Sequence, residues 1–363
     1  MIRVLQIVTY MGRGGLETML MNYYRHMDHS KVQFDFLVHR DFEADYDQEI
    51  QKMGGRIYHI SRLIPWSRTY RNELKKFFTE HSEYRMVHVH QDCLSSVALQ
   101  CAEECGVPVR IAHSHSASAV KNVKYPIKVH YMKQISRYAT NLLACGEKAG
   151  DWMFGENCYQ IVRNAIDPAD YCYFPDIAKQ VREELQSDDC FIVGHVGNFT
   201  AAKNHAFLLD IFRELLKLRP KSKLLLVGGG NDRDIIRDKV KAMGIQEQVI
   251  FTGIRTDVNR LMQAMDVFVF PSLYEGLPVA MIEAQAAGLP CMISDRISEE
   301  CIVTNGLVVS KSLNESPSRW AEDILKQVHH PRENHMEEIQ DAGYDILTAA
   351  SQLEKFYIRN SRE

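Results

Sequence analysis

The sequence lacks the patterns that mark several common classes of protein. No GxGxxG follows any expected strand, which disfavours an NAD-linked enzyme acting on sugar nucleotides, because that glycine spacing forms the dinucleotide-binding turn. The nine cysteines include no CxxC pair and are odd in number, so we expect reduced thiols. No apolar run is long enough to span a bilayer, and we expect no secretory leader before the first strand at Arg3. Together these absences favour a cytoplasmic protein.

A large excess of positive charge is also missing. The net charge is −4 over 363 residues, with a mildly basic first half and an acidic remainder. Duplex nucleic acid is therefore a poor candidate partner, because binding it requires many Lys and Arg contacts to phosphate. A content of 45% hydrophobic and 25% charged residues is typical of a globular protein, and this length allows two domains.

One stretch in the second half has the pattern of a strand, a tight loop and a helix. Residues 266–270, DVFVF, predict a buried parallel strand because they are apolar and rich in Val and Phe. Residues 279–287 are compatible with a helix, for which Pro278 suits the first helical position. Gly288 and the proline two residues later provide the stop.

The loop of this stretch predicts an anion site. The backbone N–H groups of Gly276 and Leu277 would lie at a helix N-terminus, where aligned donors and the helix dipole stabilise negative charge. Glu275 and Glu283 flank that site with seven residues between them. Carboxylates beside a phosphate usually accept hydrogen bonds from hydroxyl groups, as an acidic residue does for ribose. If one of these carboxylates binds a ribose and the other a hexose, the ligand is a sugar nucleotide. The alternative is an ordinary strand-to-helix connection with two solvated glutamates.

The run at 271–290, PSLYEGLPVAMIEAQAAGLP, resembles the signature of glycosyltransferase family 4, whose members have the GT-B fold and carry a Glu-x7-Glu pair in this setting. The resemblance implies that Glu275 binds the donor sugar and Glu283 the nucleotide ribose. Further motifs extend it over most of the chain, and it is closest to the branch that builds capsular polysaccharides or exopolysaccharides.

A turn at 198–203, NFTAAK, follows an expected strand at 191–197. Lys203 in this turn could hold its ammonium group against a diphosphate. The family usually has an arginine where this chain has Asn198. A bidentate guanidinium is thus replaced by a neutral amide, so diphosphate binding should be weaker or supplemented, with Arg255 as one candidate.

Two other loops of the second half are expected at the donor. Gly229 belongs to a run of three glycines at the end of a strand at 223–227, the place where ligands bind in open α/β sheets. The resemblance further implies that Ile254 and Arg255, which follow another strand, face the nucleotide base.

The first half contributes a glycine-rich turn at 12–15 after the first strand. By itself this turn is most simply a tight connection. In the family, a Gly-Gly pair followed by a small or apolar residue and Glu lines the donor phosphate or the acceptor. Gly14 and Gly15 match that pattern.

Two HxH pairs, at 88–90 and 113–115, follow each other in the first half. Such pairs can bind a metal, but neither has a Cys or carboxylate at ligand spacing, so we expect no zinc. Two DxD triplets, at 45–47 and 232–234, are too common a pattern to assign a metal either. A histidine at a strand end is usually structural. The family has one in the first-domain loop that contacts the donor sugar or acceptor, which indicates His115, with His113 as the alternative.

Residues 121–137 combine lysines and an arginine with apolar side chains. A basic amphipathic stretch of this kind can lie on an anionic membrane, here the inner leaflet, where a lipid-linked acceptor would be found. The alternative is a solvated helix face over a core stripe.

Alternation of strands and helices along the whole chain predicts an α/β protein of GT-B architecture, with two doubly wound Rossmann-like domains facing across a cleft. We expect an N-terminal acceptor-side domain at 1–168 and a nucleotide-sugar-binding domain at 169–340. Residues 341–363 would form a C-terminal helix that returns to the first domain.

These patterns together predict a glycosyltransferase that uses a nucleotide-diphosphate sugar, with UDP favoured, and a saccharide or polyprenyl-linked acceptor. The expected catalytic residues are Glu275, His115 and Lys203, with no metal and no further cofactor. The resemblance implies retention at the anomeric carbon. Because of Asn198, a non-catalytic sugar-nucleotide binder or a decayed partner subunit of a transferase stays open as the alternative.

Overall fold

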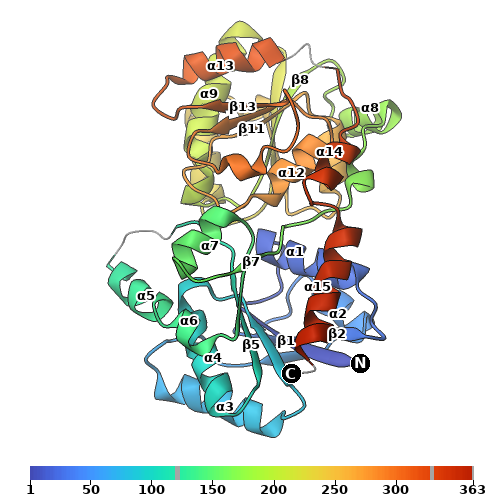
Figure 1. Ribbon diagram of the computed structural model, residues 1–363. Coiled ribbons are helices and arrows are strands. Elements are labelled where there is room, and N and C mark those ends of the chain that lie inside the picture. Colours follow the sequence, from blue (N-terminus) through green and yellow to red (C-terminus); the bar gives the residue numbers. More distant parts are fainter. Residues whose placement is uncertain (119–122, 328–330, 362–363) are drawn as a thin grey trace. The chain divides into compact units, whose positions relative to one another are not determined.

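The computed structural model describes residues 1–118, 123–327 and 331–361. The chain forms two compact units, each built around a parallel β-sheet (Figure 1). Unit 1 consists of Met1–Ala165 and Ile346–Glu363, and unit 2 consists of Ile166–Asp345. The polypeptide therefore leaves unit 1, forms unit 2 and returns to unit 1.

Unit 1 has a seven-stranded sheet in the order β3-β2-β1-β4-β5-β6-β7, and every pairing is parallel. The order reverses between β1 and β4, which makes this pair the switch point of a doubly wound sheet. The strands are β1 (Ile2–Val8), β2 (Val32–Val38), β3 (Ile57–His59), β4 (Met86–Val89), β5 (Val109–Ser114), β6 (Asn141–Ala144) and β7 (Gln160–Ile161).

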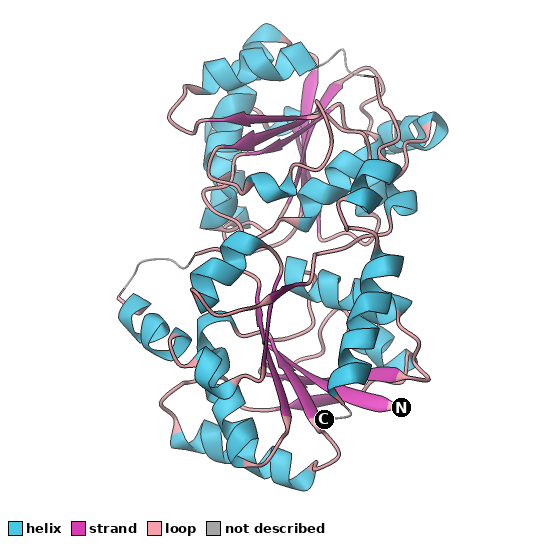
Figure 2. Cartoon of the chain, viewed as in Figure 1, coloured by secondary structure: helices cyan, strands magenta, loops and turns pink. Residues whose placement is uncertain are grey.

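Helices cover both faces of this sheet (Figure 2). Alternate residues of β1 enter two separate cores: Val4 and Val8 belong to one, Leu5 and Ile7 to the other. The strand is therefore buried on both faces and mostly apolar, and Gln6 is a buried polar exception. The helices of unit 1 are α1 (Gly15–His26), α2 (Asp47–Lys52), α3 (Arg68–Glu80), the 3-10 helix η1 (Asp92–Leu94), α4 (Ser95–Glu104), α5 (Tyr125–Met132), α6 (Ile135–Tyr138), α7 (Glu147–Phe154) and α15 (Ile346–Asn360).

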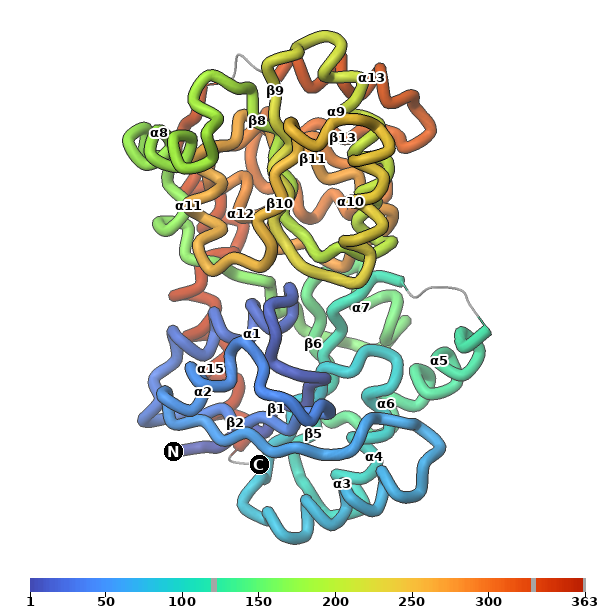
Figure 3. The backbone as a smooth tube through the Cα atoms, turned by 180° about the vertical axis from the view of Figure 1, so that it is seen from behind, coloured from blue at the N-terminus to red at the C-terminus, as the bar shows by residue number. Residues whose placement is uncertain are grey.

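The last helix, α15, packs against the N-terminal part of the chain (Figure 3). Its Tyr357 is fully buried and contacts the ring of Phe34 in β2. The amide of Asn141, at the start of β6, donates to Asn360 at 3.1 Å. Because these contacts join the two ends of the sequence, α15 is part of the core of unit 1.

Unit 2 has a six-stranded parallel sheet in the order β10-β9-β8-β11-β12-β13. Its switch point lies between β8 and β11. The strands are β8 (Phe191–Val196), β9 (Ser222–Val227), β10 (Val249–Gly253), β11 (Val267–Phe270), β12 (Cys291–Ser294) and β13 (Val308–Lys311). The helices are η2 (Pro168–Tyr171), α8 (Pro175–Glu184), η3 (Ala201–Lys203), α9 (His205–Leu218), α10 (Arg233–Ala242), η4 (Gln246–Gln248), α11 (Val258–Gln263), α12 (Val279–Ala286), η5 (Glu299–Cys301), α13 (Pro317–Lys326) and α14 (Met336–Asp341).

Two Rossmann-like parallel sheets confirm the predicted α/β class. One detail of the expected loop was wrong. Pro278 is the N-cap of α12 with an extended backbone (φ −73°, ψ 114°), and the helix begins one residue later at Val279. Gly288 ends the helix as expected, with a left-handed φ of +63°. Within the described part of the chain, no helix is both long enough and apolar enough to cross a bilayer.

Candidate functional site

The site in unit 2 is formed by loops that leave the carboxyl ends of neighbouring strands. Because β8, β9, β10 and β11 are parallel and adjacent, the loops at 197–203, 228–230, 254–257 and 271–278 all leave the same edge of the sheet. Ligands of open α/β sheets bind at this edge, beside the point where the strand order reverses. Nine of the predicted site residues come from these four loops and from α12.

Lys203 and Glu275 form an ion pair at the centre of this edge. The ammonium of Lys203 lies 2.8 Å from Oε1 of Glu275, and these side chains are only 18% and 13% exposed. The ammonium also lies 4.5 Å from the centre of the Phe270 ring, a cation–π distance. A partly desolvated pair of this kind presents one cation and one hydrogen-bond acceptor at the loop edge.

Two hydrogen bonds to backbone carbonyls explain why Lys203 and Glu275, which are far apart in sequence, meet. The N–H of Leu273 donates to the carbonyl of Ala202 at 2.8 Å, and the side chain of Asn204 donates to the carbonyl of Pro271 at 3.1 Å. Asn204 has a left-handed φ of +54°, a conformation that Asn tolerates better than most residues. The turn after β8 is therefore fastened to the loop after β11.

Glu283 lies inside α12 and is buried. Its Oε1 accepts a hydrogen bond of 2.8 Å from the hydroxyl of Tyr171 in η2. Burial raises the pKa of Glu283 to about 7, and the Tyr171 hydrogen bond opposes that shift. This carboxyl group is thus poised to exchange its proton near neutral pH.

Gly276 and Leu277 precede α12, as expected. Gly276 is half-buried, whereas Leu277 is buried and already takes part in a polar interaction within the chain. Gly276 is therefore the more accessible of the two residues.

The three glycines after β9 approach the turn after β8 closely. Gly228 and Gly230 have φ values of +146° and +134°, which disfavour other residues. A Cβ atom on Gly228 would lie 2.2 Å from the carbonyl oxygen of Gly197. A Cβ atom on Gly229 would lie 2.8 Å from the side chain of Ile254, so this predicted residue pair is in contact.

The other predicted donor residues are at the surface. Asn198 and Ile254 are exposed. Arg255 forms a bidentate pair with Asp257, with N–O distances of 2.8 and 2.7 Å. The guanidinium suggested as a substitute for the missing arginine is therefore held by a neighbouring carboxylate.

In unit 1, Gly14 and Gly15 lie at the N-terminus of α1. A Cβ atom on Gly14 would lie 2.3 Å from Oε2 of Glu17, so the glycine makes room for this carboxylate. The Glu17 carboxylate accepts a hydrogen bond from the backbone of Gly14, yet burial raises its pKa to about 7. The chain's own carboxylate occupies the N-terminus of α1.

His115 and its alternative His113 are both in contact with the other HxH pair. Nε2 of His115 lies 2.8 Å from Nδ1 of His90, and Nδ1 of His113 lies 3.1 Å from Nε2 of His88. His113 is fully buried and His115 half-buried, so His115 is the more accessible of the two. Burial lowers the pKa of His115 to about 3, which keeps its ring neutral.

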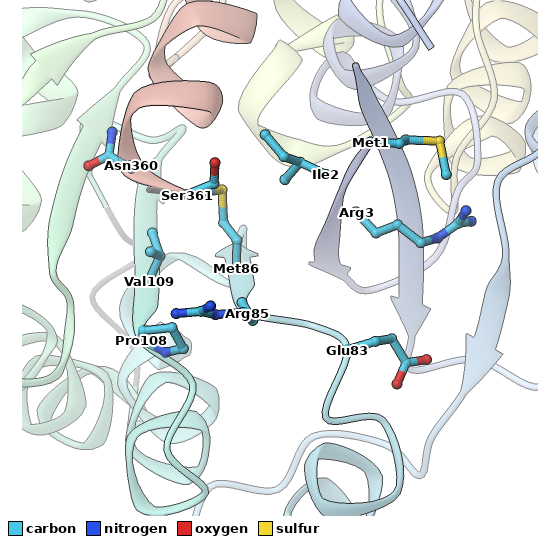
Figure 4. A pocket seen from close by; sticks show the side chains of 10 residues that line it. All are labelled: Met1, Ile2, Arg3, Glu83, Arg85, Met86, Pro108, Val109, Asn360 and Ser361. Atoms are coloured by element: carbon cyan, nitrogen blue, oxygen red, sulfur yellow. The ribbon is translucent and has the colours of Figure 1, made fainter. Parts of the chain in front are cut away.

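Two pockets of unit 1 differ in their position on the sheet. One, of about 210 Å³, lies at the amino ends of β1, β4 and β5, beside Ile2, Met86 and Val109 (Figure 4). The second, of about 350 Å³, lies at the carboxyl ends, lined by His39, Arg40 and eight further residues that include His90 and Gln91. Only the second is at the edge where α/β sheets bind ligands.

Comparison with known proteins identifies the family. A family model described as "Glycosyl transferases group 1" matches residues 190–330. The putative glycosyltransferase EpsF of Bacillus subtilis is 38% identical, over 98% of this chain and 96% of the relative. The chain belongs to the group 1 glycosyltransferases. The predicted family relationship and the predicted enzyme class are thereby confirmed.

Other relatives of this glycosyltransferase carry more specific names. CapH of Staphylococcus aureus, a capsular polysaccharide biosynthesis glycosyltransferase, is 24% identical over 99% of both chains. An Escherichia coli UDP-Gal:alpha-D-GlcNAc-diphosphoundecaprenol alpha-1,3-galactosyltransferase is 25% identical over 61% of both chains. The crystal structure of Anabaena HepE in complex with UDP and glucose has a TM-score of 0.82 at 16% identity and covers 98% of this chain and 99% of HepE. That structural likeness shows a shared fold.

Sequence reasoning missed several residues of this glycosyltransferase that the structure brings to its sites. Tyr171 holds Glu283, and Phe270 lies under Lys203. Gln6 and Tyr357 bond to the histidine cluster. Aromatic residues at 171 and 270 were visible in the sequence, but their partners are distant along the chain and no local pattern connects them.

Proposed function

We propose that this glycosyltransferase moves a sugar from a UDP-sugar to a saccharide or polyprenyl-linked acceptor during synthesis of a cell-surface polysaccharide. The Lys203–Glu275 pair is the observation that carries this proposal. It lies at the carboxyl edge of the unit 2 sheet, and its Glu275 belongs to the loop that leads into α12, the helix that contains buried Glu283.

Each group of the site has a role in the proposed reaction. A donor diphosphate would compete with Glu275 for the ammonium of Lys203, because an ammonium prefers the higher negative charge of a diphosphate. Glu275 would then be free to accept hydrogen bonds from hydroxyl groups of the donor sugar. Glu283, in its ionised form, would accept those of the ribose. The Gly276 amide and the N-terminus of α12 would add stabilisation of the leaving phosphate.

Catalysis in this proposal is electrostatic and needs no metal ion. Lys203 and the glycine-rich turns would stabilise charge on the leaving diphosphate as the bond to the sugar breaks. The family resemblance favours retention of configuration at the anomeric carbon, with His115 contacting the donor sugar or the acceptor. Uridine is favoured as the nucleoside because the E. coli relative is named for UDP-Gal and the HepE crystal structure is a complex with UDP.

The pocket at the carboxyl ends of the unit 1 strands is the proposed acceptor side. Arg40 and Arg62 line it, and two guanidinium groups suit an anionic acceptor such as a lipid diphosphate. The E. coli relative, whose name contains a diphosphoundecaprenol acceptor, supports this class.

The segment 121–137 is the proposed membrane contact of a cytoplasmic protein. Lys121 lies outside the described residues, but α5 and its flanks are described. None of the α5 side chains is fully buried, and Val123 and Ile127 are 96% and 39% exposed beside lysines 124, 128 and 133. Exposed apolar side chains among cations suit the surface of an anionic bilayer.

Thermal shift with a panel of UDP-, GDP- and ADP-sugars tests the donor. A ligand that binds only the folded state raises the melting temperature by mass action. We expect a UDP-sugar to give the largest shift and a following transfer or hydrolysis assay to release UDP. A larger shift with a GDP- or ADP-sugar would overturn the choice of nucleotide.

Variants of the ion pair test the site. Glu275→Gln and Lys203→Ala are expected to reduce turnover at least 100-fold while the protein stays folded. Lys239→Ala is the matched control, since Lys239 forms a pair of the same 2.8 Å length with Asp210 elsewhere in unit 2. Unchanged turnover in Glu275→Gln and Lys203→Ala would show that this ion pair is not part of the active site.

Co-sedimentation with vesicles tests the membrane contact. We expect binding to vesicles that contain anionic lipid, none to neutral phosphatidylcholine, and at least tenfold weaker binding after Ile127→Glu with Lys133→Glu. Equal binding of this variant and the wild type would refute the contact.

A further inference from the structure

The four histidines of the two HxH pairs lie together on one face of the unit 1 sheet. β4 and β5 are parallel, with His88 opposite Ile111, and alternate residues of a strand share a face. One ring nitrogen from each of His88, His90 and His113 lies within 4.8 Å of those of the other two. The sequence separates the pairs by 25 positions, so only the register brings them together.

Outer hydrogen bonds orient two of these rings. Nε2 of His90 lies 2.8 Å from Oε1 of Gln6, which can only accept. His90 therefore carries its proton on Nε2, and the lone pair on its Nδ1 faces Nε2 of His115 at 2.8 Å, so a metal ion would take the place of that hydrogen bond. Nδ1 of His88 lies 2.8 Å from the hydroxyl of Tyr357, which leaves Nε2 for a ligand. A metal-binding histidine is usually held in this way, through the ring nitrogen that does not touch the metal.

The cluster is not satisfied by its own hydrogen bonds. Nε2 of His113 is buried and has no hydrogen-bond partner among the described residues. His113 is also fully buried, so bulk water does not compensate. A buried polar atom without a partner is costly, but a metal ion held by Nδ1 of His113 would leave Nε2 unpartnered, so this atom is not counted among the ligands.

The spacing and chemistry of these nitrogens suit a transition metal. Two nitrogens on a tetrahedral Zn²⁺, each about 2.0 Å away, are about 3.3 Å apart. Nε2 of His88 and Nδ1 of His113 are 3.1 Å apart, close to that separation. Imidazole is a preferred ligand of Zn²⁺, Cu²⁺ and Ni²⁺ and a poor one for Mg²⁺ or Ca²⁺.

An entrance and a nearby negative charge are also present. His90 lines the pocket of about 350 Å³ at the carboxyl ends of the strands, so the cluster is reached from that pocket. Asp92 lines the same pocket and accepts a hydrogen bond from the backbone of His115. Its carboxylate would offset part of the charge of a divalent cation.

We propose that His88, His90 and His113 bind one divalent transition-metal ion, with Zn²⁺ as the best fit and His115 adjacent as a further nitrogen. The ion would join β4 to β5 and, through Tyr357, to α15. The proposed donor residues belong to unit 2, whereas this cluster borders the pocket proposed for the acceptor and contains His115, so metal content rather than turnover is the readout that tests it.

Metal analysis of the full-length protein tests this directly. The protein is treated with a chelator, incubated with Zn²⁺, freed of excess metal and analysed by mass spectrometry. We expect one Zn²⁺ per chain and a higher melting temperature with Zn²⁺ than with Mg²⁺. X-ray absorption should show only nitrogen or oxygen near 2.0 Å. A shell of sulfur near 2.3 Å, indicating cysteine ligands, or metal well below one per chain would overturn the proposal.

Variants separate metal binding from a purely hydrogen-bonded cluster. His90→Asn is expected to lose stoichiometric Zn²⁺, and Tyr357→Phe to weaken Zn²⁺ affinity about tenfold while keeping the ring in the core. His195→Asn is the matched control, because His195 is equally buried but lies in unit 2 and bonds to the Val269 carbonyl. If His90→Asn fails to fold, the X-ray absorption spectrum of the wild type still shows whether the metal ligands are nitrogen or sulfur. Equal Zn²⁺ affinity of Tyr357→Phe and wild type would contradict the proposed orienting role.

Discussion

Burial shifts the pKa values of several single residues in unit 2, so the stability of the protein depends on pH. Glu283 has a pKa of about 7 because it is buried, against an ordinary value of 4.5. His205 and His195 shift the other way: burial lowers the pKa of His205 to about 4 and that of His195 well below its usual range. These groups therefore oppose one another in the pH dependence of stability.

The substitution Glu283→Gln isolates the contribution of this carboxyl group to the pH dependence of stability. Between about pH 4.5 and 7 the folded state keeps a proton that the unfolded chain releases, so wild-type stability falls as the pH rises. The amide oxygen of Gln can still accept the Tyr171 hydrogen bond but does not titrate. We expect the free energy of unfolding of the variant, relative to wild type, to rise by about 2–3 kcal/mol from pH 5 to pH 8, measured by urea denaturation.

The control for this measurement is an exposed glutamate, Glu333→Gln. Its difference from wild type should stay nearly constant over the same pH range. A constant difference for Glu283→Gln as well would mean that Glu283 is ionised in the folded protein throughout.

Asn198 gives a second test at the residue scale. It is exposed in the turn that contains Lys203, where family members usually have an arginine. Asn198→Arg would add a cation with bidentate donors, so we expect UDP to bind about tenfold more tightly, or about 1.4 kcal/mol, by titration calorimetry. Asn198→Gln keeps an amide and should bind UDP as the wild type does. Equal UDP affinity of the arginine and glutamine variants would remove position 198 from the diphosphate site.

At the scale of elements, close approach between two loops shapes the unit 2 site. The turn after β8 and the glycine run after β9 are in backbone contact: the N–H of Phe199 donates to the carbonyl of Gly229 at 2.6 Å. Side chains at Gly228 or Gly230 would collide with backbone atoms of the first turn. The position of Lys203 therefore depends on residues that it does not touch.

Gly228→Ala should destabilise the protein more than an ordinary glycine substitution. Gly244→Ala is the matched control, because Gly244 also has a positive φ, +68°, but has open space around its Cβ position. Gly244→Ala costs about 1–2 kcal/mol for a left-handed backbone. Gly228→Ala, at φ +146°, costs at least as much for its backbone and adds a clash worth about 1–3 kcal/mol. Denaturant unfolding would measure the stability of both variants. Equal losses of unfolding free energy would show that the loop moves to accommodate the Cβ atom at position 228 without a measurable penalty.

At the scale of the whole molecule, the two units differ in how the chain builds them. Unit 2 is one continuous segment, Ile166–Asp345, whereas unit 1 needs both ends of the sequence. Removing α15 would remove Tyr357, expose the core residues that pack against this helix and leave Nδ1 of His88 without its hydroxyl partner.

Fragments test this difference. We expect residues 166–345 to unfold cooperatively and to bind UDP, whereas 1–165 alone should lack a cooperative transition, as followed by circular dichroism. The control joins 1–165 to 346–363 through a flexible Gly/Ser linker, which should restore folding. A cooperative transition of 1–165 without α15 would contradict the expected role of that helix.

The sequence by itself determined the class of fold and supplied the residues of the proposed donor site. Apolar runs such as 266–270 and the glycines that follow strands are local patterns, and they predicted the strands, the loop before α12 and the Glu275/Glu283 pair. Local patterns suffice there because strand burial and helix ends depend on residues a few positions apart.

Only the tertiary structure decided which distant groups meet. Lys203 and Glu275 are 72 positions apart, Tyr171 and Glu283 112, and Tyr357 reaches His88 across 269. The sequence predicts no zinc at either HxH pair because neither has a Cys or carboxylate at ligand spacing, and the pairing of β4 with β5 is what joins the two pairs. Such contacts follow from strand register and from the return of α15, which no window of sequence contains.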